Sequence, residues 1–188
     1  MEFKEVFRRV SEVLQASSVP YMLTGSFASS YYGVLRATHD IDIVISPTAQ
    51  SLKALVQNLN SSSYYADLHS ALDALREHSM FNAIDNETGW KVDFIFCKPS
   101  AYAREAFQRR KEVTFQQNLM FVSSVEDVIV SKLEWAKMGE SARQIDDVAA
   151  VLKKQRNAAD LSYVEKWVKE LRLSSEWERA CKIAASNN

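Results

Sequence analysis

The sequence predicts an α+β fold, with strands and helices in residues 1–122 and a helical part in residues 123–188. In the first part, short apolar runs with strand character alternate with amphipathic segments of helical period. Two of these runs, "MFNAI" and "WKVDFIF", flank "DNETG" and are typical of a hairpin. After Ser123 the strand-like runs give way to helical segments, about four in number. We therefore expect a core domain followed by a helical subdomain.

The first elements are bounded by turn residues. Residues 2–16 show the apolar spacing of a helix, and residues 19–24 have the character of a short strand. Gly25 breaks that strand, and Ser26 is a suitable N-cap for a short helix that stops at Gly33. A strand–turn–helix unit is therefore predicted near the start of the chain.

The later elements of the first part alternate in the same way. Residues 40–45, "DIDIVI", predict a second strand, and "SP" from Ser46 opens a helix. Another helix is expected from Ala66 onward. Ser100 is expected to cap one more helix, and "EVTFQQNLMFV" predicts one or two short strands.

Composition and charge exclude several classes of protein. The 188 residues are 47% hydrophobic and 25% charged, which is typical of a globular protein in water. No apolar run is long enough to span a membrane. The formal net charge is -1, so no overall basic field indicates nucleic acid, although a local basic patch stays open. Cys97 and Cys181 lie far apart and lack metal-ligand spacing, so we expect a reduced, cytoplasmic protein.

Two carboxylates stand inside the strand "DIDIVI". Because strand side chains alternate, Asp40 and Asp42 share one face while Ile41 and Ile43 share the other. Like charges this close repel each other and favour a cation between them. A hard cation such as Mg²⁺ suits paired carboxylates and keeps positions for substrate phosphates. The alternative is a solvated strand face whose carboxylates pair with Arg36 or a lysine.

Two further features point to phosphate chemistry. The "TGS" turn contains Gly25, which lets the backbone approach a ligand closely, and the following helix offers N–H groups to a phosphate. Asp93 stands in the strand "WKVDFIF" and faces away from its apolar neighbours, a local conflict that tends to mark a site. An ordinary capped corner and an exposed sheet face are the alternatives. Together, the turn and three carboxylates suit two-metal phosphoryl or nucleotidyl transfer.

Other polar residues are weaker candidates for binding phosphates. Arg36 and Thr38 precede the carboxylate strand and either steady phosphates or form loop ion pairs. Basic residues also form two clusters that are solvated faces or, at most, guides for a polyanionic acceptor. These clusters are Arg104, Arg109, Arg110 and Lys111, and then Lys153, Lys154 and Arg156.

The stretches "TGSFASSYYG" and "RATHDIDIVI" resemble the signature of the DNA-polymerase-beta-like nucleotidyltransferase superfamily. That signature is a Gly-Ser turn, an Asp-x-Asp strand and a third Asp on a later strand, and it is matched by Gly25, Ser26, Asp40, Asp42 and Asp93. The resemblance implies a mixed sheet flanked by helices. It also implies transfer of a nucleoside monophosphate from an NTP, with the three aspartates as catalytic ligands of Mg²⁺, two ions being expected.

The C-terminal half is similar to the AbiEii-type toxin and related small nucleotidyltransferase families. The similarity lies in "SVEDVIVSKLEWAK" followed by "SARQIDDVAAVL", in which Lys132 and Asp147 match the family pattern. Gln144 departs from it, because the family often has an acidic residue there. The resemblance implies that Lys132 touches the triphosphate and that Asp147 supports the nucleotide site.

Helical geometry tests these two residues separately. Lys132 falls in the middle of an apolar stripe of its helix, so its ammonium either snorkels from a core face or reaches into a site. We favour the site, because a lysine is unusual in that position. Asp147 lies away from the apolar stripe of its own helix, which leaves a solvated helix face as an equal alternative.

These observations predict a Mg²⁺-dependent nucleotidyltransferase that uses an NTP and a hydroxyl acceptor. The acceptor is RNA, such as tRNA, if the protein is a toxin restrained by an antitoxin protein. It is a small molecule such as an aminoglycoside if the protein modifies metabolites or drugs. A catalytically silent nucleotide-binding module is a third alternative, and the intact set of carboxylates argues against it.

Overall fold

The computed structural model describes residues 2–35, 38–115 and 117–186. Its contacts divide the chain into two compact units. The sheet unit comprises Met1–Thr24 and Ala37–Val122, and the helical unit comprises Gly25–Arg36 and Ser123–Asn188. In the described part of the chain, no helix has both the length and the apolar character that crossing a membrane requires. The expected division into a core domain of residues 1–122 and a subdomain of residues 123–188 stays a prediction.

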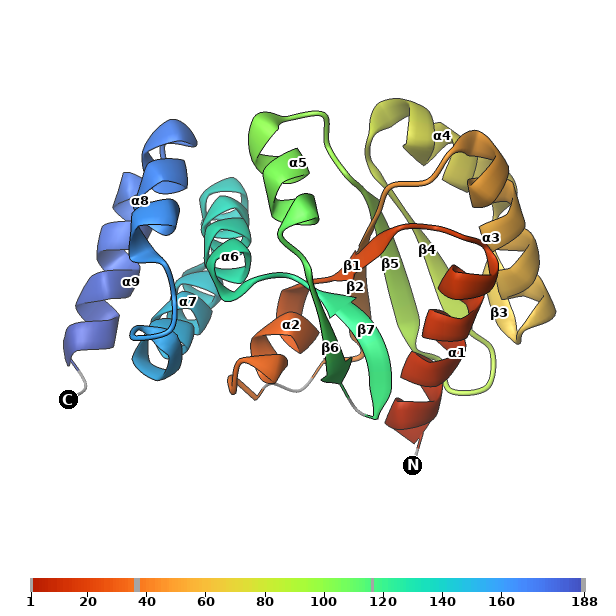
Figure 1. The fold of residues 1–188 in the computed structure, drawn as a ribbon, viewed down its shortest axis with the longest axis horizontal. Helices are drawn as coiled ribbons and strands as arrows, with labels where there is room; N and C mark the ends of the chain where they lie inside the picture. The colour runs from red at the N-terminus through yellow and green to blue at the C-terminus, as the bar shows by residue number, and fades with distance from the viewer. Residues whose placement is uncertain (1, 36–37, 116, 187–188) are drawn as a thin grey trace. The chain divides into compact units, whose positions relative to one another are not determined.

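The sheet unit is built on one mixed sheet of seven described strands in the order β3-β4-β5-β2-β1-β7-β6 (Figure 1). β2 pairs with β5, and β1 with β7, in parallel, and the other neighbours are antiparallel. This arrangement confirms the predicted α+β fold with a mixed sheet. The strands are β1 Tyr21–Leu23, β2 Asp40–Ile45, β3 Tyr64–Ala66, β4 Met80–Asp85, β5 Lys91–Phe96, β6 Lys111–Phe115 and β7 Asn118–Val122.

Helices bury one face of this sheet. The helices of the sheet unit are α1 Glu2–Ala16, α3 Ala49–Ser61, α4 Leu68–Glu77 and α5 Ala101–Gln108. α1 packs against α3 and β7, and α3 packs against β3 and α4. The central strands present an unbroken apolar surface to this core. Its members are Ile41, Ile43 and Ile45 of β2 and Val92, Phe94 and Phe96 of β5.

Two boundaries differ from the sequence prediction. The helix expected from Ala66 begins at Leu68, because Tyr64–Ala66 forms β3 and pairs with β4. Three residues are too short for a visible alternation, and only the pairing reveals the strand. The helix expected to open at Ser46 begins at Ala49, because Thr48 and Ser51 form a capping box.

The helical unit contains α2 Gly25–Tyr31, α6 Val125–Gly139, α7 Ala142–Gln155, α8 Leu161–Glu170 and α9 Ser174–Ser186. The four predicted helical segments of the C-terminal part are thus confirmed. α2 starts at Gly25, so Ser26 lies in its first turn and the prediction of Ser26 as N-cap is wrong. The end of α2 is tied to α7, since Gln155 Nε2 donates to the Tyr32 carbonyl at 3.1 Å and Lys154 Nζ donates to the Gly33 carbonyl.

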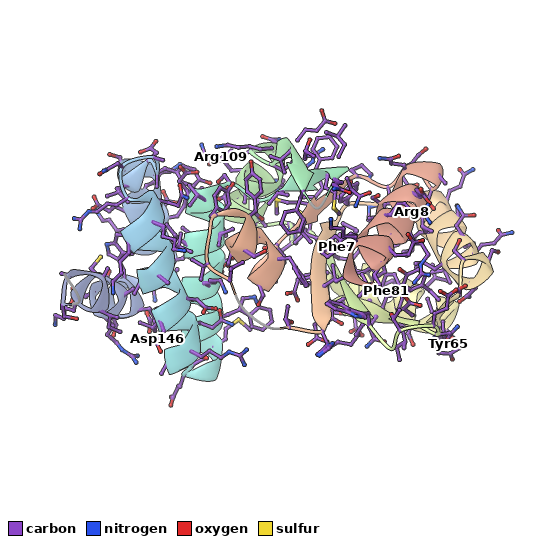
Figure 2. All side chains as sticks on the ribbon, turned by 90° about the horizontal axis from the view of Figure 1, so that it is seen from below. Phe7, Arg8, Tyr65, Phe81, Arg109 and Asp146 are labelled. Atoms are coloured by element: carbon purple, nitrogen blue, oxygen red, sulfur yellow. The ribbon has the colours of Figure 1, made fainter. Side chains whose placement is uncertain are left out.

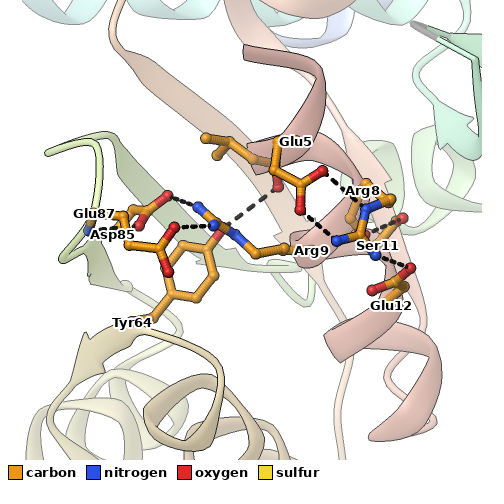
Figure 3. Close-up of polar contacts among 9 residues, drawn as sticks. Glu5, Arg8, Arg9, Ser11, Glu12, Tyr64, Asp85 and Glu87 are labelled. Atoms are coloured by element: carbon orange, nitrogen blue, oxygen red, sulfur yellow. Dashed lines mark hydrogen bonds and ion pairs between the residues drawn. The ribbon is translucent and has the colours of Figure 1, made fainter. Parts of the chain in front are cut away.

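A buried carboxylate joins α1 to the β4–β5 hairpin (Figure 3). Asp85, the last residue of β4, is fully buried and pairs with the guanidinium of Arg9. The same carboxylate accepts from the Glu87 N–H at 3.0 Å and from the Thr88 hydroxyl at 2.9 Å. Arg9 also contacts Glu87 at 2.6 Å. These contacts offset part of the desolvation of both charges, while Arg9 Nε has no partner among the described residues. The sequence analysis did not identify these contacts.

We predict that Arg9→Met costs about 3 kcal/mol or more of unfolding free energy, because it leaves the Asp85 carboxylate buried without its counterion. Arg8→Met is the matched control. Arg8 pairs with Glu5 and Glu12 on a half-exposed helix face, where water and salt screen the charges, so its loss should change the unfolding free energy little. Urea unfolding measures both variants, and equal losses would show that the buried pair has no special weight.

Tyr64 gives a second prediction, on the pH dependence of stability. Burial of the phenol raises the pKa of Tyr64 to about 12, whereas an unfolded chain titrates tyrosine near about 10. Between these values the unfolded chain has lost a proton that the folded protein keeps. The unfolding free energy should therefore fall as the pH rises, by about 1.4 kcal/mol per pH unit for this group.

Urea unfolding of wild type and Tyr64→Phe between about pH 9 and about pH 12 checks this expectation, because the variant lacks the titrating phenol. The variant should lose stability less steeply. Burial also raises the pKa of Tyr21 and Tyr32, so part of the alkaline loss should persist in the variant. The same slope in both proteins would contradict the assignment to Tyr64.

Candidate active site

The parallel pairing of β2 with β5 brings the predicted carboxylates together in the sheet unit. The register sets Asp42 beside Asp93 and Asp40 beside Lys91. Asp40 is exposed, Asp42 is half-buried and Asp93 is 6% exposed. The three carboxylates therefore share the sheet face opposite to the apolar core, and their environment becomes drier from Asp40 to Asp93.

Lys91 is the residue that the sequence analysis missed. Its Nζ lies 2.9 Å from Asp93 Oδ2 and 3.4 Å from Asp40 Oδ1. The hydrogen bond to Asp93 raises the pKa of Lys91, which favours the charged ammonium. A signal was present, since Lys91 stands two residues before Asp93 in one strand and therefore shares its face. Only the strand order shows that it also meets Asp40.

The salt bridge to Lys91 accounts for only one of the two carboxylate oxygens of Asp93. Asp93 Oδ1 is buried and has no hydrogen-bond partner among the described residues. Buried polar atoms are nearly always paired, so an unpaired carboxylate oxygen needs an explanation. A ligand that carries a positive charge or a hydrogen-bond donor would provide the partner of this oxygen.

The donor set fits a hard divalent cation in one particular way. In the described part of the chain, no group of three or more His, Cys, Asp and Glu side chains is gathered in a way that would hold a metal ion. Mg²⁺ does not need such a group, because it binds through one or two carboxylates and takes its other oxygens from water and substrate phosphates. Asp42 and Asp93, adjacent across the two strands, meet that requirement.

The backbone around the carboxylate strand is fixed by local hydrogen bonds. The Thr24 N–H donates to the Asp42 carbonyl at 2.9 Å. Thr38 Oγ1 accepts from the Asp40 N–H at 3.1 Å, at the point where β2 begins. Arg36 lies outside the described residues. The His39 ring packs near Trp90, with ring centroids 5.3 Å apart.

In the helical unit, Lys132 and Asp147 form a buried ion pair. Lys132 Nζ lies 2.8 Å from Asp147 Oδ2 and 3.2 Å from Gln144 Oε1. The side chains of Lys132 and Asp147 are 4% and 13% exposed. The two residues that the sequence analysis treated separately are thus partners, and Gln144, the departure from the family pattern, is a third member. Neighbouring Asp146 is exposed (Figure 2).

The "TGS" turn also has a defined conformation. Gly25 has a φ of 63°, in the left-handed region that side chains with a Cβ rarely adopt. Its carbonyl accepts from the Ser29 hydroxyl at 3.0 Å within α2. Gly25, Ser26, Lys132 and Asp147 belong to the helical unit, and the three carboxylates belong to the sheet unit.

Several members of the basic clusters are engaged by their own chain. The Arg110 guanidinium lies 4.3 Å from the Phe107 ring centroid and 5.1 Å from that of Phe121. Arg104 Nη1 donates to the Pro99 carbonyl at 2.9 Å. Such contacts reduce the number of basic groups that are at hand for a polyanion.

No model of a protein family matches this sequence, and none of the curated proteins matches it. Solved structures do share its fold. ANT(2")-Ia in complex with adenylyl-2"-tobramycin is 12% identical with a TM-score of 0.62, covering 95% of this chain and 99% of that chain. The lincosamide antibiotic adenylyltransferase LnuA with bound lincomycin is 14% identical with a TM-score of 0.54, covering 80% and 96%.

An antigenic nucleotidyltransferase-like protein from Paracoccidioides brasiliensis is also similar, with 16% identity, a TM-score of 0.55 and coverage of 95% and 93%. The chain therefore has the fold of the nucleotidyltransferases, as the sequence predicted. The closer relationship to AbiEii-type toxins stays a prediction.

The buried pair of the helical unit gives a prediction about stability. Lys132→Met should cost about 3 kcal/mol or more, because the largely buried Asp147 carboxylate then loses the Lys132 ammonium. Lys132→Met combined with Asp147→Leu should recover most of that loss. Asp146→Leu is the control, since this neighbouring carboxylate is exposed. Urea unfolding of the cycle measures the coupling, and strictly additive losses would contradict the pairing.

Proposed function

We propose that this protein is a Mg²⁺-dependent nucleotidyltransferase that moves a nucleoside monophosphate from an NTP to a hydroxyl acceptor. One observation carries the proposal. In a fold shared with nucleotidyltransferases, the buried carboxylate of Asp93 lies beside Asp42 and keeps one oxygen without a partner among the described residues. Because buried polar atoms are usually paired, the open oxygen of Asp93 supports a ligand at this place.

The three aspartates have distinct roles in the proposed reaction. Asp40, Asp42 and Asp93 would hold divalent cations, which neutralise the charge of the triphosphate and lower the pKa of the acceptor hydroxyl. Asp93 is the driest of the three, so its carboxylate is also suited to take the proton of the attacking hydroxyl. Asp40 is exposed and is suited to a cation that arrives with the nucleotide.

We assign phosphate binding to the helical unit. Gly25 and Ser26 offer backbone N–H groups, and Lys132 offers a fixed positive charge. Asp147 and Gln144 hold the ammonium of Lys132 in one position, which reduces the entropy lost on binding. Arg36 is assigned to the phosphates only on its position before the carboxylate strand in the sequence. We place the protein in the cytoplasm because both cysteines are free.

For the acceptor, we propose a hydroxyl-bearing small molecule. Two structures that share the fold are antibiotic adenylyltransferases. In addition, Arg104 and Arg110 of the predicted basic cluster contact their own chain. RNA is the second candidate, favoured by the similarity of α6 and α7 to AbiEii-type toxins, and it would require an antitoxin protein as partner.

Incubation with each labelled NTP and Mg²⁺ tests the proposal. One set of reactions contains total RNA, and another contains a panel of aminoglycosides and lincosamides. Label on a small molecule supports the first candidate, and label on RNA supports the second. Transfer to neither, by a protein that binds NTP, would favour the silent module.

We predict that Asp93→Asn lowers transfer on the order of 10²-fold or more, the scale of a lost acid–base group. NTP affinity should stay within a few-fold, because Asp93 is not assigned to the phosphates. Asp146→Asn is the control, since it removes an exposed carboxylate from another element. Single-turnover transfer measured beside NTP binding decides, and an undiminished rate in Asp93→Asn would remove Asp93 from the site.

A further inference from the structure

We propose that Lys91 is a counterion built into the carboxylate site, which holds Asp40 and Asp93 in the metal-free protein and releases them to an arriving divalent cation. The inference rests on the proposed function, because it assumes that these aspartates bind a cation. It adds a residue that the nucleotidyltransferase signature does not contain. The exchange would make the site stable without metal and receptive to it.

The first argument is the position of Lys91 in the sheet. The residue stands beside Asp40 across the parallel strands and two residues before Asp93 in its own strand. Its ammonium bridges the two carboxylates, 2.9 Å from Asp93 Oδ2 and 3.4 Å from Asp40 Oδ1. The lysine therefore contacts a carboxylate of each strand at the place where a shared cation would carry its charge.

The second argument is the charge balance on this face. Among the described residues, the Lys91 ammonium contacts two carboxylates, and the more buried of them, Asp93, has a partner for only one of its oxygens. A buried carboxylate is costly unless it is paired and hydrogen-bonded. Lys91 thus pairs with only one of the two carboxylate oxygens of Asp93. A divalent cation brings twice the charge and can also bind Asp93 Oδ1, the oxygen that Lys91 does not contact.

The third argument is that Lys91 can leave at small cost. Its side chain is 38% exposed, and an ammonium on a flexible four-carbon stem is readily hydrated. A fixed guanidinium or a fully buried lysine would resist displacement. Lys132 is such a case, with a side chain that is only 4% exposed. Lys91 and Lys132 thus differ in side-chain exposure, the property that exchange requires.

Chemical labelling tests the exchange directly. Wild-type protein is acetylated briefly with and without saturating Mn²⁺, and the modification of each lysine is read by mass spectrometry. Pairing with Asp93 should protect Lys91 in the metal-free protein, so Mn²⁺ should raise its labelling about fivefold, the scale of a released ion pair. Exposed Lys98, in the same sample, is the internal control and should not change.

Two variants add a readout that does not depend on labelling. Lys91→Met should melt about 2 to 4 °C below wild type without metal and should gain more from Mn²⁺ than wild type does. Calorimetry should show that it binds Mn²⁺ about fivefold more tightly. Lys98→Met removes the same charge from an exposed position and should match wild type in both measurements.

The outcomes separate this inference from the proposed function. If Mn²⁺ binds but leaves the labelling of Lys91 unchanged, Lys91 is not displaced and the inference is overturned. The inference is also overturned if neither wild type nor Lys91→Met binds Mn²⁺, or if the variant is as stable as wild type without metal. If Mn²⁺ releases Lys91 but no NTP transfers label, the inference about Lys91 stands and the proposed function is wrong.

Discussion

The parallel pairing of β2 with β5 is the constraint on which the candidate site depends. Strand side chains have a period of two, so a slip of one residue would move every carboxylate to the opposite face. The apolar face prevents this slip, because Ile41, Ile43 and Phe94 are fully buried against the helices of the sheet unit. Burial on one face therefore excludes slips of one residue and keeps Asp42 and Asp93 together on the other face, where the observed register sets them side by side.

The same sheet contains two buried carboxylates that are satisfied to different degrees. Asp85 pairs with Arg9 and accepts hydrogen bonds from Glu87 and Thr88, so both of its oxygens are used. Asp93 has Lys91 on one oxygen and no described partner on the other. Buried polar atoms are usually paired, so the open oxygen of Asp93 calls for an explanation that Asp85 does not need. This contrast supports the proposed ligand role of Asp93.

The sequence predicted the parts of the site that depend on local alternation and not those that depend on neighbours. Alternation alone placed Asp40 and Asp42 on one face and set Asp93 against its apolar neighbours. Lys91 was missed because its contact with Asp40 follows from the strand order, which a single sequence does not reveal. The pairing of Lys132 with Asp147 was missed for a similar reason. Each residue was judged on its own helix, while the contact between α6 and α7 decides.

Lys91 and Lys132 show how burial assigns different tasks to the same side chain. Lys132 is held by a carboxylate and an amide in a place that water hardly reaches, so its charge stays where the fold puts it. Such a lysine suits a ligand whose charge is fixed, as in a triphosphate. The Lys91 side chain is partly exposed, so water can hydrate its ammonium when the ion pair breaks. In the proposed reaction, the fixed ammonium of Lys132 would orient the triphosphate. The movable ammonium of Lys91 would pair with Asp93 until a metal ion takes its place.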